Sequence, residues 1–509
     1  MSPPDDPALH VGVESDLPRQ VVVGRGDLLL VHGWCVHERL PVRHVELLVG
    51  SERQPLREQG TPRPDITPPG ITSTGATGFL GFAELREPVV TESVEIRLAA
   101  RLADGEVACR LIGEVEVVPH ERKRWAVPTG RAPRIAICMA TYDPPLELFR
   151  NQIDSIRAQS YDNWICLISD DNSRPEALEL IRETLGDDPR FRLQVNPERL
   201  GVYRNFECAL RLVEPDVPLV ALADHDDRWD PDKLAALVSE LRADVTLVYS
   251  DARVTDAEGR LVAPTFWTER ANNTDDLGRL LLVNSITGAA TLFRSELLDY
   301  LLPFPATEGL MHDHWLALVA MTVGEVAYVD RPLYDYVQHQ RAALGHERDR
   351  PRRRPSRPQL RAVRDRDGLR RLVFDRLEMM RLCYYVLLGV IASAELLLLR
   401  VGDAIEGRKQ RAVRRCARLD RSPQAWAWLA QLLVRSRVGR SKTLGVERLV
   451  LVGALWRPTL RALRPLKLPL ADPHGETMAV MLRLPHAGPA RSVAMPQPRS
   501  PQGPSMPRT

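Results

Sequence analysis

Apolar and polar positions follow three different patterns along the chain. Between residues 20 and 120, short apolar or alternating runs are separated by turn residues, and no helical period extends over a long window. Between residues 131 and 345, strand-like apolar runs alternate with helical windows, whereas residues 369–470 show long helical windows. A chain of 509 residues is too long for one core of ordinary size. The pattern therefore predicts a multidomain protein.

The first part, residues 20–120, has the pattern of a small antiparallel β-sandwich. Interruptions by Gly, Ser and Asp suit the turns between its strands. Segments 33–36 and 45–49 resemble accessory β-sandwich modules that are fused to some bacterial sugar-transfer enzymes. We interpret this part as a scaffold or homo-oligomerisation domain in preference to a carbohydrate-binding domain. Residues 1–19, which precede it, are expected to be disordered.

The central part, residues 131–345, shows strands that alternate with helices. The expected strands and helices follow one another as residues 135–139, 146–159, 164–169, 175–185, 191–195, 202–213 and 218–223. This β-α-β-α order favours a mostly parallel, Rossmann-like sheet with helices on both faces. In sheets of this kind, ligands bind at the carboxyl ends of the strands.

The last part is expected to be helical. An Arg- and Pro-rich linker, residues 346–368, leads to a helical domain at 369–470, and the tail at 471–509 has too little apolar content to fold alone. The longest apolar stretch, 382–399, is interrupted by a glutamate and is near the lower length limit of a membrane span, so we predict a buried helix. Arginines near it suit peripheral contact with an anionic membrane, but we favour the alternative of a helical bundle packed on the central domain, with its arginines solvated or paired.

Composition limits the partners and the cellular compartment that can be expected for the protein. The net charge of +2 gives no global reason to expect a nucleic-acid partner. The seven cysteines are scattered without a CxxC pair, which fits a reducing compartment better than a disulfide scaffold or a zinc site. The first residues lack the features of a secretion signal. We therefore expect a cytoplasmic protein, with a peripheral position at the inner face of the plasma membrane as a variant.

An acidic cluster is the most informative feature of the chain. Asp224, Asp226 and Asp227 surround His225 directly after the apolar run 217–222. Hard divalent cations prefer oxygen ligands, so such a cluster at a strand end suits Mg²⁺ or Mn²⁺ held against nucleotide phosphates. A solvated acidic turn is the alternative, but adjacent acids repel one another unless a cation is present.

Two further polar clusters follow the first two expected strands. Thr141, Tyr142 and Asp143 follow the first, and Asp170 and Asp171 follow the second. An aromatic ring beside a carboxylate suits recognition of a flat base that carries N–H donors. The alternative is that the two aspartates only form a turn and cap the next helix.

Taken with segment 159–164, these clusters resemble the ordered motifs of inverting family 2 glycosyltransferases with the GT-A fold, including rhamnosyltransferase-like enzymes of bacterial surface glycans. The resemblance covers about residues 131–345. It implies a metal-dependent hexosyltransferase that moves a sugar from a UDP- or dTDP-sugar donor to a carbohydrate or lipid-linked glycan acceptor. The product class would belong to cell-wall or surface polysaccharide biosynthesis.

The resemblance also implies roles for individual residues. Tyr142 would stack on the base and Asp171 would hydrogen-bond it. The same pocket would be lined by Thr141, Asp143, Asp170, Asp224, Asp226 and Arg204. The metal would be bound by Asp226, Asp227 and His339. The short metal-binding DXD motif fits either Asp224 with Asp226 or Asp226 with Asp227, and Arg341 would offset phosphate charge.

The catalytic base is expected at the start of a helix that follows a Gly-containing acceptor loop. Segment 287–293 is such a loop, and Asp313 precedes an apolar helical pattern. The resemblance therefore implies Asp313 as the base, and a helix N-cap role is its competitor. The acceptor pocket would also contain Gly288, Ala289, His312, His314 and Trp315.

Two other functions are compatible with parts of this pattern. A sugar nucleotidyltransferase would also use a nucleotide-binding sheet, but the chain has no Gly-rich loop with a downstream Arg and Lys near the first expected strand. A noncatalytic scaffold or binding protein with a transferase-like domain predicts loss of acidic site residues, and these are present. The transferase is thus the leading hypothesis.

Overall fold

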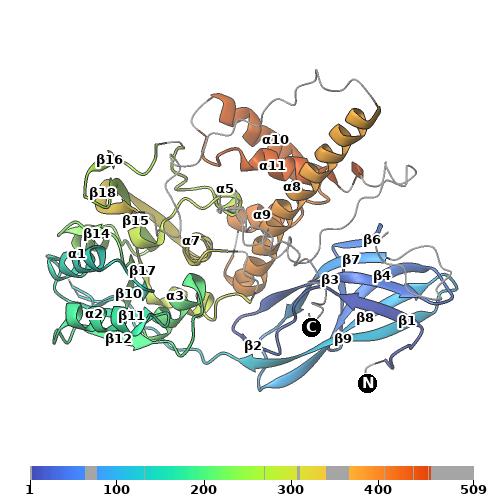
Figure 1. The fold of residues 1–509 in the computed structure, drawn as a ribbon, viewed down its shortest axis with the longest axis horizontal. Coiled ribbons are helices and arrows are strands. Elements are labelled where there is room, and N and C mark those ends of the chain that lie inside the picture. Colours follow the sequence, from blue (N-terminus) through green and yellow to red (C-terminus); the bar gives the residue numbers. More distant parts are fainter. Residues whose placement is uncertain are drawn as a thin grey trace, which may run out of the picture.

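The computed structural model describes residues 3–62, 77–130, 132–268, 270–306, 310–339, 366–405, 407–438, 441–456 and 458–459. Within these residues, an N-terminal β-structure and a central α/β domain lie side by side, and the C-terminal helices pack against both of them (Figure 1). The following paragraphs take the three parts in chain order.

The N-terminal part is a β-sandwich of two sheets. One sheet has the order β1-β3-β7-β6, formed by Leu9–Val13, Asp27–His37, Thr77–Leu85 and Glu58–Pro62. The other has the order β2-β9-β8-β4-β5, formed by Gln20–Val23, Val107–Pro119, Glu92–Leu102, Val42–Val49 and Glu52–Pro55. Alternating side chains of both sheets share one core, for example Leu29 and Val31 with Val45 and Leu47. This is the arrangement of a sandwich, in which two inner faces interdigitate.

Two features of the sandwich differ from the sequence-based expectation. Residues 1–19 were expected to be disordered, but strand β1 pairs antiparallel with β3. Leu9 is buried in the sandwich core, so its burial stabilises a segment whose Pro- and Asp-rich start concealed a short strand. In addition, β2 pairs in parallel with β9, so the sandwich is not purely antiparallel.

The first half of the central domain follows the predicted alternation closely. It consists of β10 (Ile135–Thr141), α1 (Leu146–Arg157), β11 (Trp164–Asp170), α2 (Pro175–Leu185), β12 (Phe191–Val195), α3 (Val202–Arg211) and β13 (Leu219–Asp224). Strands β10, β11 and β13 are buried along almost their whole length. Continuous apolar runs of this kind are typical of parallel strands covered on both faces.

The second half of the domain makes the sheet mixed. It consists of β14 (Arg228–Trp229), α4 (Lys233–Ser239), β15 (Val245–Asp256), β16 (Leu261–Ala263), α5 (Leu277–Leu282), η1 (Gly288–Ala290), β17 (Thr291–Arg294), η2 (Ser295–Leu297), α6 (Leu298–Leu301), α7 (His312–Val323) and β18 (Glu325–Gln338). The sheet order is β12-β11-β10-β13-β17-β15-β18-β14, and β16 pairs with β15.

The expectation of a mostly parallel sheet is therefore wrong for this half. Strand β17 runs antiparallel between β13 and β15. Strands β14 and β16 also pair antiparallel. A buried apolar run reads the same in either direction, so the local pattern did not reveal the reversal. Part of segment 287–293, expected to be a loop, belongs to β17.

The C-terminal part consists of α8 (Arg366–Val401), η5 (Gly402–Ala404), α9 (Gly407–Cys416), α10 (Pro423–Val438) and α11 (Val446–Ala454). Helix α8 begins inside the expected linker 346–368, whose residues 346–365 lie outside the described residues, as does the expected disordered tail 471–509. Gly453 allows α11 to approach α8 closely, because a Cβ there would lie 2.3 Å from the carbonyl oxygen of Cys383.

Helix α8 is also the helix, among the described residues, that is long and apolar enough to cross a membrane, over Met379–Val401. Most of that apolar window, 61%, is buried against the rest of the fold. Glu395, which interrupts the window, forms an ion pair with Arg57 of the sandwich. The helix thus has partners inside the protein for both its apolar and its charged side chains.

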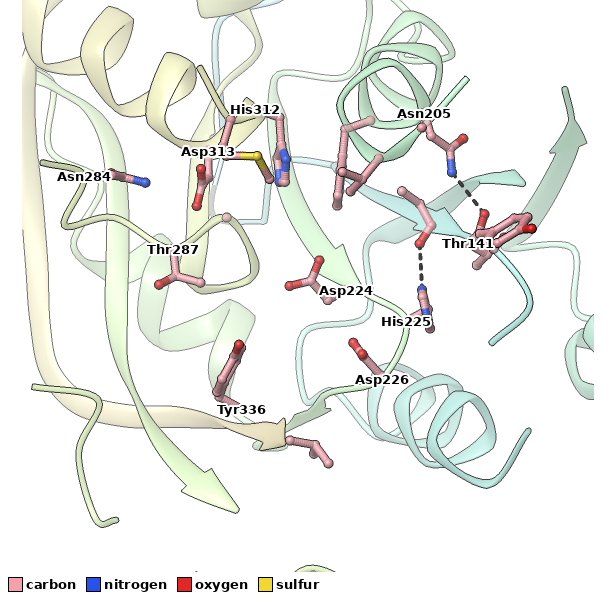
Figure 2. A pocket seen from close by; sticks show the side chains of 18 of the residues that line it. Thr141, Asn205, Asp224, His225, Asp226, Asn284, Thr287, His312, Asp313 and Tyr336 are labelled. Atoms are coloured by element: carbon pink, nitrogen blue, oxygen red, sulfur yellow. Dashed lines mark hydrogen bonds between the residues drawn. The ribbon is translucent and has the colours of Figure 1, made fainter. Parts of the chain in front are cut away.

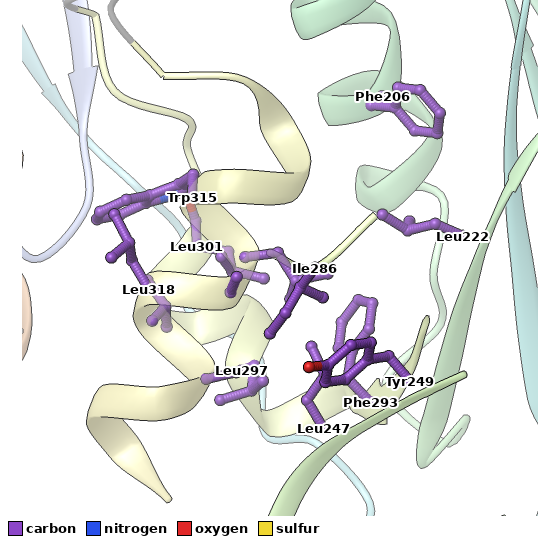
Figure 3. Close-up of a cluster of buried hydrophobic side chains, with 14 of the residues drawn as sticks. Phe206, Leu222, Leu247, Tyr249, Ile286, Phe293, Leu297, Leu301, Trp315 and Leu318 are labelled. Carbon is purple, nitrogen blue, oxygen red and sulfur yellow. Dashed lines mark hydrogen bonds between the residues drawn. The ribbon is translucent and has the colours of Figure 1, made fainter. Parts of the chain in front are cut away.

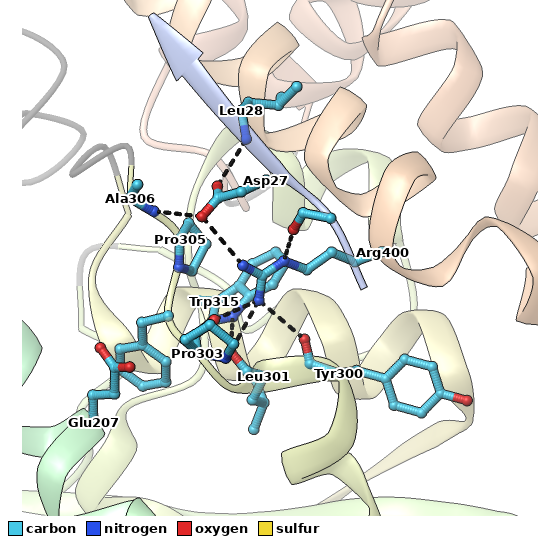
Figure 4. Close-up of polar contacts among 12 residues, drawn as sticks. Asp27, Leu28, Glu207, Tyr300, Leu301, Pro303, Pro305, Ala306, Trp315 and Arg400 are labelled. Carbon is cyan, nitrogen blue, oxygen red and sulfur yellow. Dashed lines mark hydrogen bonds and ion pairs between the residues drawn. The ribbon is translucent and has the colours of Figure 1, made fainter. Parts of the chain in front are cut away.

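Arg400, near the end of α8, connects the three parts of the molecule (Figure 4). Its Nε donates a hydrogen bond to the carbonyl of Gly26 in the sandwich, at 2.7 Å. Its Nη1 donates to the carbonyl of Pro303 in the central domain, at 2.6 Å. A buried guanidinium requires such acceptors, because an unpaired buried charge is strongly unfavourable. These hydrogen bonds therefore fix how helix α8, the sandwich and the central domain meet.

The core beneath the cavity fixes the first turn of α7. Trp315 and Leu318 of α7 are buried in the same hydrophobic cluster as Leu301, Ile286 and Phe293 (Figure 3). Close packing of this kind leaves little freedom to the helix that carries it. The residues that begin α7 are thereby held at a constant place relative to the sheet.

Candidate active site

A cavity of about 690 Å³ opens at the carboxyl ends of β10 and β13. Its wall is completed by the start of α3, by the turn before β17 and by the first turn of α7 (Figure 2). Many of the predicted site residues line it, namely Thr141, Tyr142, Asp143, Asp171, Asp224, Asp226, Gly288, His312, Asp313 and His339. Residues far apart in the sequence thus meet where this fold class binds ligands.

Tyr142 lies at one end of the cavity. Its ring is half-buried, and the guanidinium carbon of Arg199 lies 4.1 Å from the ring centroid. The backbone N–H of Asp143, which has a φ of +40°, donates to Ser173 Oγ at 2.8 Å. The carboxylate of Asp143 accepts from Arg174 Nε at 2.9 Å. Together these residues form an aromatic and cationic surface of the kind that binds a flat base.

Asp170 does not line the cavity, contrary to the prediction. It is fully buried and accepts hydrogen bonds from Thr141 Oγ1 at 2.8 Å and from Ser173 Oγ at 2.7 Å. Asp170 therefore holds the loops after β10 and β11 together. A carboxylate at a strand end with several local donors takes this structural role readily.

Asp171 does line the cavity, but its carboxylate is already engaged. Oδ1 accepts from the N–H of Leu200 at 2.6 Å, and Oδ2 accepts from the N–H of Gly201 at 2.8 Å. Gly201 has a φ of +83°, which favours glycine. Asp171 thus anchors the turn that begins α3, and this turn also positions Arg199.

Asp224, His225 and Asp226 all line the cavity, from the end of β13 and the loop after it (Figure 2). His225 Nδ1 lies 3.1 Å from the carbonyl oxygen of Ala140, which fixes the loop against β10. Asp226 Oδ2 lies 2.7 Å from His339 Nε2. The loop after β13 thereby meets the end of β18.

The electrostatics of this cluster favour a cation. Burial, together with the negative charges of Asp226 and Asp313, raises the pKa of Asp224 to about 7. Burial also opposes ionisation of Asp226, but the hydrogen bond to His339 and the charge of His225 outweigh it and lower its pKa. A positive ion between the carboxylates would relieve their mutual repulsion.

The side chains around the acidic loop can be compared with the ligands that a divalent cation requires. Among the described residues, no three His, Cys, Asp or Glu side chains converge as a complete metal site. Magnesium, however, is commonly held by one or two carboxylates with waters and substrate phosphates as the remaining ligands. Asp224 and Asp226 line the cavity with His339 beside them, so the residues fit such an open site.

Asp227 lies behind the cavity wall, contrary to the prediction that it binds the metal. Its side chain is 2% exposed, and Oδ1 accepts from the N–H of Val337 at 3.2 Å. Burial and the charges of Asp224 and Asp226 raise its pKa well above the ordinary value. Of the two ways to place the DXD motif, the structure favours Asp224 with Asp226.

Lys233 supports the loops around the cavity, and its role was not predicted from the sequence. It is fully buried, and its ammonium lies 3.5 Å from the ring centroid of Trp229 and donates to the carbonyl of Ala289. Burial lowers its pKa well below the ordinary value, against the attraction of Asp227. Its place within an apolar helical window is the feature of the sequence that could have indicated this buried role. Ala289 thus contributes its backbone to the loop and does not line the cavity.

Asp313 occupies the first turn of α7. The N-cap residue of this helix is Met311, so the alternative that Asp313 is the N-cap is wrong. Asp313 Oδ1 accepts from the N–H of His314 at 2.6 Å. Burial raises its pKa to about 6, although hydrogen bonds from the backbone of His314 and Gly288 act in the opposite direction. A carboxylate with this pKa suits proton transfer near neutral pH.

The residues around Asp313 divide into two groups. His312 lines the cavity and stacks on Phe206 with 3.8 Å between ring centroids, and burial lowers its pKa to about 3. His314 and Trp315, which were expected in the acceptor pocket, point into the core instead. Their ring nitrogens lie 2.7 Å from the carbonyl of Leu280 and 3.2 Å from that of Leu301. Successive helix residues face different directions, so not all of them reach one cavity.

Gly288 brings the loop before β17 close to α7. A Cβ at this position would lie 3.0 Å from His312 Nε2 and 3.4 Å from the Cβ of Asp313. A side chain there would therefore be in tight contact with the ring of His312. The predicted Gly-containing loop therefore lies directly beside the predicted base.

Arg204 does not face the cavity, contrary to the prediction. It donates to the carbonyls of Phe304 at 3.0 Å and Pro305 at 3.0 Å and pairs with Glu207. The arginines that line the cavity are Arg174, Arg199 and Arg270. The position of Arg199, two residues before the glycine that precedes α3, was the available signal. Arg341 and most of the segment after His339 lie outside the described residues.

Comparison with known proteins agrees with this geometry. Residues 136–302 match the sequence model of the family described as Glycosyl transferase family 2. The match contains the strand ends that carry Tyr142, Asp171, Asp224 and Asp226. The matched region thus has the sequence pattern of a family 2 glycosyltransferase domain, on a mixed sheet flanked by helices with acidic residues at the end of β13.

Individual proteins show more limited similarity. An uncharacterized protein y4gI of Sinorhizobium fredii is 33% identical over 122 residues, which is 23% of this chain and 13% of that protein. The solved structures with similarity include a mannosyltransferase of Pyrobaculum calidifontis in complex with GDP-Man and Mn²⁺, at 20% identity over 66% of this chain and 91% of that chain, with a TM-score of 0.34. Another is S. aureus TarS in complex with UDP-GlcNAc, at 16% identity over 64% of this chain and 92% of that chain, with a TM-score of 0.35. At such TM-scores the superposition is loose, so the fold assignment depends on the strand order and the family match.

Proposed function

We propose that the protein is a metal-dependent, inverting hexosyltransferase that moves a sugar from a nucleoside diphosphate donor to a glycan acceptor. The observation that carries the proposal is the meeting of Asp224, Asp226 and Asp313 in one cavity whose far end presents Tyr142 under Arg199. Nucleotide recognition, cation binding and a proton acceptor are thereby available within one site.

The donor would lie across the strand ends. Tyr142 offers its ring to the base, and Arg199 covers the same ring and brings positive charge toward the diphosphate. Asp224 and Asp226, with His339 beside them, would hold Mg²⁺ or Mn²⁺, which supplies positive charge for the leaving diphosphate. Asp171 and Gly201 keep the start of α3 in place, so the donor end of the cavity is preorganised.

The transfer itself needs one base. Asp313 would take the proton of the acceptor hydroxyl while the oxygen of that hydroxyl forms a bond to the anomeric carbon. The bond between this carbon and the diphosphate oxygen breaks in the same step, and the diphosphate leaves with the electron pair. A single displacement from the face opposite to the leaving group inverts the anomeric configuration.

Calorimetric titration of the full-length protein with UDP, GDP and dTDP, each with Mn²⁺ and with EDTA, tests the proposal. We expect binding of one nucleotide that EDTA removes. The corresponding nucleotide sugar should then donate its sugar to an acceptor, and proton NMR of the product should show the inverted anomer. Failure of all three nucleotides to bind in the presence of Mn²⁺ would contradict the proposal and favour a noncatalytic scaffold.

The setting we propose is the cytoplasmic face of the membrane, where a lipid-linked glycan acceptor of surface polysaccharide assembly would be presented. The support is a basic face on α9, which carries the exposed side chains of Arg408, Arg411 and Arg414, with the exposed Arg418 in the turn that follows the helix. Basic helices bind anionic leaflets through a salt-sensitive attraction. Flotation with vesicles that contain phosphatidylglycerol should carry the protein at low salt and release it at high salt. Equal recovery with neutral vesicles would exclude this contact.

A further inference from the structure

The turn between α10 and α11 reaches the cavity, although it is far from the transferase domain in sequence. Leu444, in this turn, is one of the residues that line the cavity. Its side chain is 40% exposed, and its φ is +52°, a conformation that residues other than glycine rarely adopt. The C-terminal helices therefore present an apolar side chain in a strained backbone conformation to the site.

This turn is anchored to the central domain. The N–H of Ala271 donates to the carbonyl of Ser441 at 3.0 Å. Lys442 Nζ lies 3.5 Å from Asp275 Oδ1. Within the turn, the buried Thr443 donates from Oγ1 to the buried Glu447. Such contacts hold Leu444 in place relative to segment 271–275 and offset the cost of its conformation.

Other apolar residues line the same cavity as Leu444. Phe266 and Tyr336 also line the cavity, and their rings make an edge-to-face contact with 5.7 Å between centroids. The N–H of Phe266 donates to Asp251 Oδ1 at 3.0 Å, which fixes the segment that carries the ring. Leu444 and the two rings therefore supply apolar lining from three separate chain segments.

Polar groups lie beside this apolar lining. Asn284 and Tyr336 are on the Asp313 side of the cavity, whereas Thr141 and Asn205 are on the opposite side (Figure 2). Arg270 lines the same cavity, and its guanidinium carbon lies 5.3 Å from the ring centroid of Trp267. The amide of Asn284 is already engaged, because its Nδ2 donates to the carbonyl of Ile286 at 3.0 Å and its Oδ1 accepts from the N–H of Ile286 at 2.9 Å. The cavity lining thus combines apolar surface with the guanidinium of Arg270.

We propose that Leu444, Phe266 and Tyr336 form the apolar face of an acceptor subsite that binds a saccharide ring, with Arg270 toward its hydroxyls. A pyranose ring has an apolar C–H face and a polar hydroxyl edge, and the wall offers a complement to each. The proposal rests on the proposed function, because Asp313 accepts a proton from the acceptor and the acceptor must therefore bind on its side. The C-terminal helices would thereby take part in acceptor selection.

Saturation-transfer NMR with methyl glycosides of common hexoses tests this subsite. The protein is saturated with Mg²⁺, which is diamagnetic and does not broaden the sugar signals, and with the nucleoside diphosphate that it binds. We expect signals at the sugar ring protons of at least one glycoside, and L444A and F266A should weaken its binding about tenfold, the loss expected from one good apolar contact. L449A is the matched control, since Leu449 on α11 is 41% exposed and does not line the cavity.

The outcomes separate this proposal from the proposed function. Unchanged nucleotide affinity in L444A, with weakened glycoside binding that L449A does not share, supports the subsite. Equal glycoside affinity in L444A, F266A and the wild type would overturn it, as would binding of the nucleotide without binding of any glycoside. Absence of nucleotide binding in the wild-type protein would instead contradict the proposed function.

Discussion

The guanidinium of Arg400 lies 3.6 Å from the carboxylate of Asp27, and both side chains are fully buried where the sandwich, the central domain and α8 meet. The same guanidinium donates to the carbonyls of Gly26 and Pro303 (Figure 4). Burial raises the pKa of Asp27, although the charge of Arg400 acts in the opposite direction. The pair therefore couples the stability of parts that are distant in sequence.

We predict that R400A lowers the free energy of unfolding by about 3–5 kcal/mol, because it leaves the carboxylate of Asp27 buried without its partner. Thermal and denaturant unfolding of the full chain measure the effect. R411A is the control, since Arg411 is exposed on α9 and should change stability by less than about 0.5 kcal/mol.

The double variant R400M/D27N provides the second measurement. Removing both charges should cost less than the sum of the single changes, because no uncompensated charge remains. Strict additivity of R400M and D27N would contradict a direct coupling between the two residues.

The second prediction separates the two adjacent aspartates of the acidic loop. D226N should lower Mn²⁺-dependent nucleotide affinity by at least about tenfold, because Asp226 lines the cavity and lies beside His339. D227N should retain that affinity, because Asp227 is buried behind the wall and an amide oxygen can still accept from Val337. Calorimetric titration with Mn²⁺ checks both.

Each variant also serves as the control of the other, since both remove one negative charge within two residues. Comparable melting temperatures would show that D226N remains folded. Equal loss of affinity in the two variants would show that Asp227 binds the cation after all.

The third prediction concerns the pH dependence of transfer. Asp313 must be ionised to accept a proton, and burial raises its pKa to about 6. The ionised fraction therefore grows with pH. At saturating Mn²⁺, which keeps Asp224 ionised, kcat/KM should rise about tenfold per pH unit below pH 6 and level off above it. His312 adds no titration in this range, because burial lowers its pKa to about 3.

The D313N variant tests whether Asp313 causes this rise of kcat/KM with pH. Its transfer rate should fall by at least about a hundredfold, the usual contribution of a general base, while nucleotide affinity stays unchanged. A D313N enzyme with the wild-type pH profile would exclude Asp313 as the base.

The fourth prediction concerns the nucleotide end of the cavity. Y142A should weaken nucleotide binding by about 1–3 kcal/mol, the usual loss when an aromatic ring no longer stacks on a base. Y142F should retain the affinity, because the ring and its contact with Arg199 remain. Fluorescence or calorimetric titration with the preferred nucleotide measures the difference.

Two neighbouring arginines give a matched comparison for the same site. R199A should weaken nucleotide binding, because Arg199 lines the cavity above Tyr142. R204A should lower the melting temperature through loss of its contacts with Phe304 and Pro305, and leave nucleotide affinity unchanged. The reverse pattern would restore Arg204 as the nucleotide-binding arginine.

The sequence by itself determined the local elements and the position of the acidic loop. The bounds of α2 and β12 agree with the predicted ranges 175–185 and 191–195, because apolar periodicity and a proline at a helix start are local properties. It also determined that carboxylates would lie at the end of β13, since Asp224, the last residue of the strand, comes directly after its apolar residues.

Only the tertiary structure decided which of these side chains meet. Whether a residue at a strand end or in a first helical turn faces the cavity depends on the packing of its neighbours, which is why Asp227, His314 and Arg204 turned away. Strand direction and contacts across hundreds of residues, such as that of Leu444 with the cavity, leave no local period in the sequence. They arise from long-range burial, which the pattern of a single segment does not encode.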